Sequence, residues 1–434
     1  MRGAAKGVKG GPVMAGKRKI GRGVAIVGAG MSNFGMFPDK DSKDLFAEAF
    51  RELMDSVDKG LDPRDIQAIW IGNFSNDFFV HQAHWGPIIA DLTGLAPRAV
   101  TRTEGACASS TLAVRDGIMA IASGMYDIVL AGGVEEMSKR TTEEVTEGLA
   151  LATSPYEGDA GFTFPGVFGA LANAYFHKYG AGREHLMNVT IKSHENAPLN
   201  PKAQFKQTIR DLMEARKEKA RKKGLPVPDW ADEKEALFDP AFNPPVAWPM
   251  HLFDCCPISD GASCVLLVAE ELAKNFTDDP IYVVGFGQGS GRGLHACPSL
   301  TSFEANRQAA AEAYGMSGLK PRDIQFAEVH DCFSIAELIH IEDLGFFGEG
   351  EAYKAVAQGE TRREGRMPIN TSGGLKCKGH PVGATGVAQM YEVWKQLRGE
   401  AGERQIPGRD LYVGATQNLG GTGGTCTFTI FERR

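Results

Sequence analysis

The sequence predicts an α/β protein made of two similar halves, and three observations support this prediction. Pro-Arg-Asp-Ile-Gln occurs at 63–67 and again at 321–325. The run VAIVGAG at 24–30 resembles IYVVGFG at 281–287, and both are apolar stretches closed by glycines. Strand-like and helix-like segments alternate, and the strand-like runs are apolar throughout, which is typical of a mostly parallel sheet covered by helices.

Two further matches follow in the same order along the chain. The glycine turn and helix pattern at 104–124 has a partner at 378–399, and DIVLAGGVEEM at 127–137 has a partner at 410–421. In the second helix, Val387, Met390, Tyr391, Trp394 and Leu397 fall at helical spacing, with Gly399 as a stop. Four matches in one order indicate an internal duplication.

The segment between the halves differs in composition. It contains the charged run RDLMEARKEKARKKG, which predicts a solvated helix, with a partner-binding surface as the alternative. The predicted boundaries are an N-terminal half at 23–138 plus about 256–275, an inserted loop domain at 139–255 and a C-terminal half at 276–434.

Residues 1–22 carry seven Lys and Arg and no acid. We expect a disordered basic tail; a targeting peptide is the weaker alternative, because the segment lacks serine.

The composition excludes several classes of protein. A chain of 434 residues suits two or three domains, and its net charge of −7 argues against nucleic acid as a partner. There is no apolar run long enough for a membrane span, and no secretory signal, so a reduced, cytoplasmic setting is expected. The eight cysteines form no pairs at zinc spacing, so we expect no metal. VGAGMSNFG has Asn33 at the third glycine of a dinucleotide motif, which argues against nicotinamide binding.

Cys107 and His380 occupy equivalent turns of the two halves. Cys107 stands in GACASS, just before a helix, where the positive end of the helix would lower the thiol pKa. His380 stands in KGHP. If the halves face each other, a thiol and an imidazole meet, an arrangement that favours a reactive thiolate. Alone, His380 would more often be a structural histidine, and the alternative for Cys107 is a small buried residue that packs a tight turn.

His330 and Cys332 flank Asp331 at the end of a predicted strand, where open α/β sheets place their sites. At a period of two residues they would share one face; a His and a Cys packed in a loop is the alternative. Cys255, Cys256 and Cys377 are interpreted as structural. The glycines of NLGGTGG at 418–424 offer backbone amides that can hold a negative oxygen.

The motifs EGACASS, SDGA, HDCF, GGLKCKGHPVGATG and NLGG together resemble the thiolase superfamily from about residue 23 onward, and especially its sterol-carrier-protein thiolase branch. The resemblance implies a five-layer α-β-α-β-α sandwich. Most thiolases carry a second catalytic cysteine where this chain has Asn418, and Asn-Glu-Ala-Phe where it has His330-Asp331-Cys332-Phe333. Cys332 would therefore replace the missing thiol.

The resemblance also implies a mechanism. Cys107 would attack a 3-ketoacyl-CoA while His380 takes its proton, and Cys332 would move the proton in the carbon–carbon step. His330 and His380 would donate to the enolate oxygen, and the amides of Cys107 and Gly420 would hold the oxyanion. CoA would be a substrate, with no bound cofactor or metal, in a role such as β-oxidation or other lipid metabolism.

Three other activities stay open at this point. A ketosynthase-type condensing enzyme shares the fold but should not need Cys332. A retro-aldolase forms no acyl-enzyme, so it should not need Cys107. An inactive thiolase-like scaffold would need none of the four reactive residues. The acyl group, the direction of reaction and the oligomeric state are open too. A homodimer or higher oligomer is expected, with a small OB-fold, zinc-ribbon protein as a possible partner subunit.

Overall fold

The structure is a computed structural model that describes residues 19–434, and its core is one nine-stranded sheet. From one edge to the other, the strands are β3 (Ala99–Thr103), β2 (Ala68–Gly72), β4 (Ile128–Glu135), β7 (Gly261–Ala269), β1 (Val24–Met31), β8 (Ile281–Ser290), β11 (Thr425–Arg433), β10 (Val413–Gly420) and β9 (Phe326–Glu328). A separate hairpin joins β5 (Pro245–Ala247) to β6 (Met250–His251).

The strand order repeats on either side of the β1–β8 pair, and this confirms the duplication. Outward from the centre, one wing runs β1, β7, β4, β2, β3, and the other runs β8, β11, β10, β9. In the described part of the chain, the second wing has four strands where the first has five. At the position of the fifth strand, beside β9, it has only a parallel bridge between Ala327 and Ile369. Each Pro-Arg-Asp sequence forms a 3₁₀ turn, at 63–65 and at 321–323, that leads into an equivalent strand, β2 or β9.

The expectation of a mostly parallel sheet is wrong. Among the described strands only β2–β3, β2–β4 and β9–β10 pair in parallel, while the other five pairings of the large sheet are antiparallel. The reason is that β7 and β11 run between parallel neighbours in the opposite direction. Since both strands are covered on both faces, their apolar sequences look like those of parallel strands.

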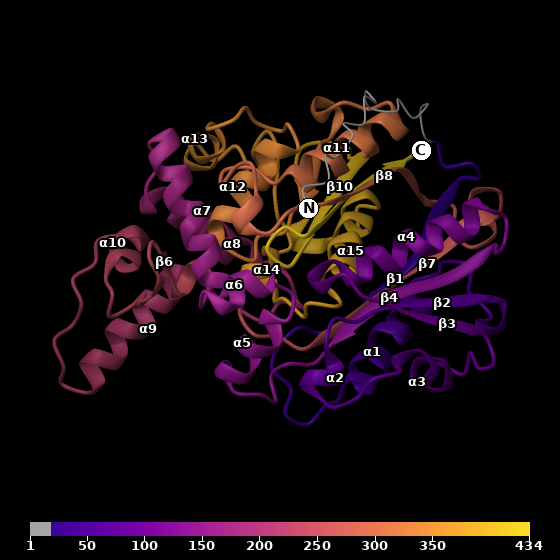
Figure 1. The fold of residues 1–434 in the computed structure, drawn as a ribbon, viewed down its shortest axis with the longest axis horizontal. Coiled ribbons are helices and arrows are strands. Elements are labelled where there is room, and N and C mark those ends of the chain that lie inside the picture. The colour runs from indigo at the N-terminus through magenta and orange to yellow at the C-terminus, as the bar shows by residue number, and fades with distance from the viewer. Residues whose placement is uncertain (1–18) are drawn as a thin grey trace, which may run out of the picture.

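The helices form layers around the two wings (Figure 1). They are α1 (Ser42–Asp55), α2 (Asn76–Phe79), α3 (Trp85–Leu92), α4 (Ser109–Ala122), α5 (Thr142–Ala150), α6 (Pro155–Asp159), α7 (Phe164–Tyr179), α8 (Arg183–Asn196), α9 (Ile209–Lys222), α10 (Glu233–Phe238), α11 (Glu304–Ser317), α12 (Ser334–Asp343), α13 (Ala352–Ala357), α14 (Gly374–Lys378) and α15 (Thr385–Leu397). α1 and α3 cover one wing, α11 and α12 cover the other, and α4 and α15 pack between the wings in a shared core. This is the α-β-α-β-α order that the resemblance implies.

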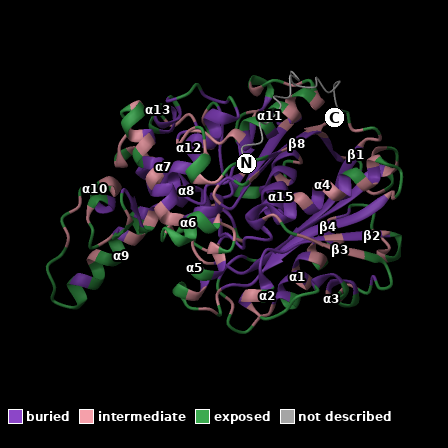
Figure 2. Cartoon of the chain, in the orientation of Figure 1, coloured by how far each residue is buried: buried purple, intermediate pink, exposed green. Residues whose placement is uncertain are grey.

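The segment 139–255 contributes α5 to α10 and the small hairpin. α7 and α8 share a core with α12, whereas α9 extends away from the body, and Figure 2 shows it largely exposed. The charged run is thus a helix: Thr208 and Asp211 cap its start, and only Ile209, Met213 and Ala220 are buried.

Most of the predicted basic tail, residues 1–18, lies outside the described residues. Arg22, at the end of that segment, forms ion pairs with Asp127 and Glu271. Within residues 19–434, none of the helices is both long and apolar enough to cross a membrane.

The two halves interlock where the end of β4 meets the loop that follows His380. A Cβ atom added at Gly133 would lie 2.0 Å from the carbonyl oxygen of Gly383 and 2.8 Å from the Cβ of Ser110. Only a residue without a side chain permits backbone to approach backbone so closely. Gly133 therefore sets the distance between the start of α4 and the loop after His380.

We expect Gly133→Ala to lower the free energy of unfolding by roughly 1–3 kcal/mol, because the added methyl group has no room. The loop after His380 would be displaced and turnover reduced with it. The matched control is Gly315→Ala in the exposed part of α11, where nothing lies within 4 Å and where alanine should stabilise the helix by about 0.5–1 kcal/mol. Urea titration monitored by circular dichroism measures both; equal stabilities for the two variants would contradict the contact.

Candidate active site

Cys107 lies in a tight turn between β3 and α4. Residues 106–108 form one 3₁₀ turn, and Ala106 adopts a left-handed φ of 50°. This bend directs the chain straight into α4 and leaves Cys107 only 7% exposed. The strand, turn and helix order is the one that the sequence predicts.

His380 follows α14 in the equivalent turn of the other half. Its Nδ1 lies 2.6 Å from the Thr385 hydroxyl, and that hydroxyl donates its own proton to the carbonyl of Pro381. The Thr385 oxygen can therefore only accept from His380. The proton of the neutral imidazole sits on Nδ1, which leaves Nε2 as a base.

His330 has the opposite arrangement. The Asn418 amide donates from Nδ2 to His330 Nδ1 at 2.9 Å, and the Asn418 carbonyl oxygen accepts from the Thr111 hydroxyl at 3.2 Å. Thr111 thereby fixes which end of the amide faces the ring. The proton of His330 is on Nε2, a buried nitrogen with no hydrogen-bond partner among the described residues. His330 thus presents a free N–H donor.

The structure brings Cys107, His330 and His380 together. One side-chain atom of each lies within 4.8 Å of the others, and the two imidazole rings lie edge to face with centroids 5.0 Å apart. A thiol and two imidazoles can also bind zinc, which needs an unprotonated nitrogen from each ring. The proton on His330 Nε2 opposes this, so the geometry suits a base beside a donor better than a metal centre.

Cys332 is buried next to this cluster but is not one of its three members. β9 ends at Glu328, so His330 and Cys332 lie in the loop beyond the strand and not on a common strand face as the sequence predicted. The Cys332 carbonyl accepts from the amide of Cys256. Burial raises the pKa of the Cys332 thiol well above its usual value, and the thiols of Cys256 and Cys107 add to this effect.

Cys256 therefore adjoins the site, although its sequence suggested a purely structural residue. Burial raises the pKa of its thiol as well, with contributions from Cys255 and Cys107. No motif around Cys256 pairs it with a histidine, so only the fold reveals its position.

The glycine loop after β10 also approaches Cys107. The backbone amides of Gly421 and of Cys107 itself lower the pKa of the Cys107 thiol. Gly420 ends β10 paired with Thr425, and a Cβ there would lie 2.2 Å from the carbonyl oxygen of Gly105. Gly420 thus allows the turn of Cys107 to approach the glycine loop.

The electrostatics of Cys107 also differ from the expectation. Burial raises the pKa of the thiol to about 12; the Gly421 amide lowers it only in part, and Glu135 raises it further. Burial and the charge of Lys378 lower the pKa of His380 to about 3. The resting pair is therefore a neutral thiol beside a neutral imidazole, and the thiolate forms only when His380 takes the proton during attack.

Two domain models of one family match nearly the whole chain: "Thiolase, N-terminal domain" at residues 24–271 and "Thiolase C-terminal domain-like" at 288–433. The chain belongs to the thiolase family. An acetyl-CoA acetyltransferase of Methanothermobacter thermautotrophicus is 42% identical to this thiolase over 418 residues, which cover 95% of this chain and all of the relative. Sterol carrier protein 2 of Homo sapiens is 30% identical over 429 residues, 95% of this chain and 72% of the relative.

Solved structures share the fold of this thiolase. The Ltp2-ChsH2(DUF35) aldolase has a TM-score of 0.76 at 24% identity, covering 94% of this chain and 97% of the other. Human mitochondrial 3-ketoacyl-CoA thiolase in complex with CoA has a TM-score of 0.65 at 18% identity, covering 96% and 99%.

We expect alkylation of Cys107 by iodoacetamide to accelerate roughly tenfold for each pH unit between about pH 7 and 9, without a plateau, because the thiol pKa lies above this range. Peptide mass spectrometry resolves Cys107 from the other cysteines. A small free thiol, which levels off above its pKa of about 8.5, is the reference. A plateau near neutral pH would mean that Cys107 and His380 already form an ion pair.

We expect Asn418→Leu to reduce kcat by roughly 10- to 100-fold, because His330 would lose the partner that keeps its proton on Nε2. The KM should change little. Thr111→Val is the milder matched variant, since it removes only the bond that orients the Asn418 amide, and it should act in the same direction. Steady-state kinetics measure both; wild-type turnover in Asn418→Leu would contradict this view of His330.

Proposed function

We propose that this thiolase is an acetyl-CoA acetyltransferase: it transfers an acetyl group between CoA thioesters through an acyl-cysteine at Cys107, and thereby joins two acetyl-CoA molecules into acetoacetyl-CoA and CoA or reverses that reaction. The observation that carries the proposal is the convergence of Cys107, His380 and His330, with the two imidazoles set in opposite tautomers. The relative at 42% identity supports acetyl as the acyl group.

Acylation begins with the thiol of Cys107. His380 Nε2 accepts the thiol proton as the sulfur attacks the thioester carbonyl, and the Nδ1–H bond to Thr385 keeps Nε2 free for this purpose. The amides of Gly421 and Cys107 receive the negative oxygen of the tetrahedral intermediate. Collapse breaks the carbon–sulfur bond to CoA, whose thiolate takes the proton back from His380.

The carbon–carbon step needs a second acid and base. Cys332 first loses its thiol proton and, as a thiolate, removes a proton from the α-carbon of the second acetyl-CoA, while His330 Nε2–H donates to the enolate oxygen that forms. The enolate carbon then attacks the acyl group on Cys107 and breaks its carbon–sulfur bond, and the Cys107 thiolate that leaves takes the proton that Cys332 had gained. Asn418 cannot exchange a proton at neutral pH, so it supports His330 instead.

CoA is thus a substrate, and no metal takes part in the proposed steps. We extend the proposal to a homo-oligomer in the cytoplasm, acting in lipid metabolism or β-oxidation. A separate small partner subunit is supported by the Ltp2-ChsH2(DUF35) aldolase, a protein of similar fold whose name includes a second component, ChsH2(DUF35).

The retro-aldolase alternative has a specific weakness. Cleavage of a carbon–carbon bond without acyl transfer does not use a nucleophilic thiol, yet this chain places Cys107 beside two histidines and two backbone amides. A ketosynthase-type enzyme would leave Cys332 without a role, and an inactive scaffold would leave all four reactive side chains without one.

The test uses intact mass spectrometry after mixing with acetyl-CoA. Wild type and Cys332→Ser should each gain one acetyl group on Cys107, while Cys107→Ala should gain none. Cys332→Ser should lose acetoacetyl-CoA cleavage by roughly 100-fold or more, the usual scale for a general acid or base, and lose solvent deuterium exchange at the α-carbon in parallel.

Cys264→Ser is the matched control. Cys264 is also a buried thiol, but it lies in β7 and packs in the core that β7 shares with α1 and α3. It should keep acetylation, cleavage and exchange. Acetylation of Cys107→Ala would contradict the assigned nucleophile, and wild-type exchange in Cys332→Ser would contradict the assigned proton carrier.

A further inference from the structure

Residues 196–205, within the inserted segment 139–255, pack along the part of the chain that leads to His380. They begin at the end of α8 and have the sequence NAPLNPKAQF. The backbone amides of Gln204 and Phe205 donate to the carbonyls of Lys378 and Cys377, each at 3.0 Å. The inserted segment is therefore bonded to the last residues of α14, directly before the turn of His380.

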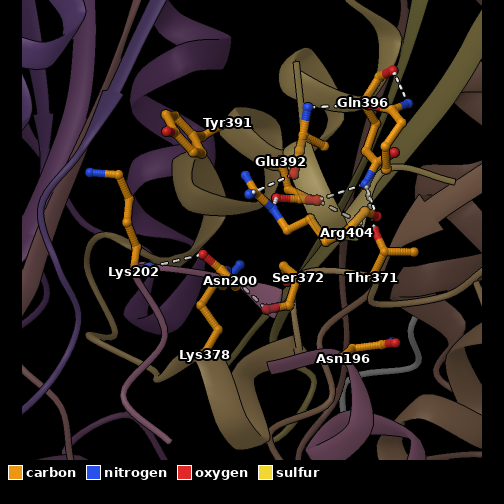
Figure 3. Close-up of polar contacts among 12 residues, drawn as sticks. Asn196, Asn200, Lys202, Thr371, Ser372, Lys378, Tyr391, Glu392, Gln396 and Arg404 are labelled. Atoms are coloured by element: carbon orange, nitrogen blue, oxygen red, sulfur yellow. Dashed lines mark hydrogen bonds and ion pairs between the residues drawn. The ribbon is translucent and has the colours of Figure 1, made fainter. Parts of the chain in front are cut away.

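Side chains of residues 196–205 bond to the chain that precedes α14. The Asn196 amide donates to the carbonyl of Asn370 at 3.1 Å, and the Asn200 amide donates to the carbonyl of Ser372 at 2.9 Å. Asn200 Oδ1 also accepts from the backbone amide of Lys202 at 3.0 Å, and Figure 3 shows Asn200 joined to both Lys202 and Ser372. These residues are therefore held along α14 and along the stretch before it.

Gln204 is connected to His380 through one hydroxyl group. Ser259 Oγ donates to Gln204 Oε1 at 2.5 Å, and the same Ser259 oxygen accepts from the backbone amide of His380 at 2.9 Å. At the other end of the Gln204 amide, Nε2 donates to the carbonyl of Ile258 at 3.1 Å. Because a carbonyl can only accept, Ile258 fixes which end of the amide faces Ser259.

The Ser259 hydroxyl depends on Gln204 for its orientation. Ser259 is fully buried, and its hydroxyl has one proton to donate. The only other acceptor that it approaches within residues 19–434 is the carbonyl of Pro257, at the longer distance of 3.3 Å. Gln204 Oε1 therefore directs the proton away from His380, which leaves a lone pair of the Ser259 oxygen for the His380 amide.

The backbone beside His380 is close to both groups. Gly379 has a left-handed φ of 114°, and a Cβ atom added there would lie 3.0 Å from Ser259 Oγ and 3.2 Å from Gln204 Oε1. The turn of His380 therefore packs directly on this pair of side chains. A shift of either one would be passed to the backbone that carries the imidazole.

We propose that Gln204 is a positioning residue for the thiolase reaction: by fixing the Ser259 hydroxyl, it holds the backbone of His380 so that the imidazole stays within reach of Cys107. The inference rests on the proposed role of His380 as the base that takes the Cys107 proton. Side-chain atoms of these two residues lie within 4.8 Å of each other. Since a misplacement of about 1 Å can cost roughly 100-fold in rate, the loss of one backbone anchor has a measurable effect.

The test measures single-turnover acetylation of Cys107 at a series of acetyl-CoA concentrations. Gln204→Met keeps an unbranched side chain of similar length and removes both polar ends. We expect the maximal rate to fall roughly tenfold, with little change in the acetyl-CoA concentration that gives half of it, because Gln204 acts through His380 and not on the substrate. Gln204→Glu keeps an oxygen that can accept from Ser259, so it should restore most of the rate.

Ser259→Ala removes the group between Gln204 and His380 and should slow acetylation to a similar degree. Because both residues act on the same backbone amide, the double variant Gln204→Met with Ser259→Ala should be about as slow as Ser259→Ala alone. Two independent effects would multiply, to roughly 100-fold. The double variant therefore distinguishes one chain of contacts from two separate losses of packing.

Asn200→Leu is the matched control. Asn200 lies in the same segment and also donates to a backbone carbonyl, but its partners are Ser372 and Lys202 and not Ser259. This variant should be acetylated at the wild-type rate even if its thermal stability falls. Circular dichroism shows which variants are folded, and Ser259→Ala tests the same contact if Gln204→Met does not fold.

The two levels of the proposal fail separately. If wild type is not acetylated at all, the proposed function is wrong. If wild type is acetylated, this inference is wrong when Gln204→Met keeps the wild-type rate or changes only the half-saturating acetyl-CoA concentration. It is also wrong when Asn200→Leu is slowed as much as Gln204→Met, or when the effects of Gln204→Met and Ser259→Ala multiply.

Discussion

The active site depends on one constraint, which is the closeness of the two halves where β4 ends. Glu135, the last residue of that strand, accepts hydrogen bonds from the amides of Phe74 and Ser75 on its own half, and a Cβ added at Gly383 of the other half would lie 2.5 Å from its Oε2. Burial raises the pKa of Glu135 to about 7, while those amides favour its charged form. A single buried carboxyl therefore gathers loops from both halves, and the bare Cα of Gly133 gives them room to meet.

The two halves contribute different catalytic groups to this site. The first half contributes the nucleophile and, through Thr111, the orientation of Asn418; the second contributes both histidines and Cys332. The two imidazole rings have opposite roles because their hydrogen-bond partners differ. The Thr385 hydroxyl accepts from His380, whereas the Asn418 amide donates to His330. The duplication explains why the halves fit together, and the differences between them explain why the site is not symmetric.

The sequence predicted the duplication, the turns of Cys107 and His380 and their meeting, because repeated segments preserve order and glycine spacing. It could not predict the direction of β7 and β11, since buried strands are apolar whichever way they run. Nor could it show that the amide of Gly421 acts on the Cys107 thiol, which depends on where β10 ends. The thiol pKa was expected in the wrong direction because the helix end is visible in the sequence, whereas the depth of burial is not. The proximity of Cys256 came from the fold alone.

The neutral resting state of the Cys107 thiol affects how readily the enzyme is inactivated by oxidants and other electrophiles. Peroxides and other electrophiles attack the thiolate far faster than the thiol, so a cysteine that remains protonated escapes most of this damage. Here the sulfur becomes nucleophilic only when a thioester carbonyl is placed before it and His380 can take the proton as the bond forms. The fold thus stores its nucleophile in an inert form between turnovers, and exposure to oxidants is confined to the brief interval of attack.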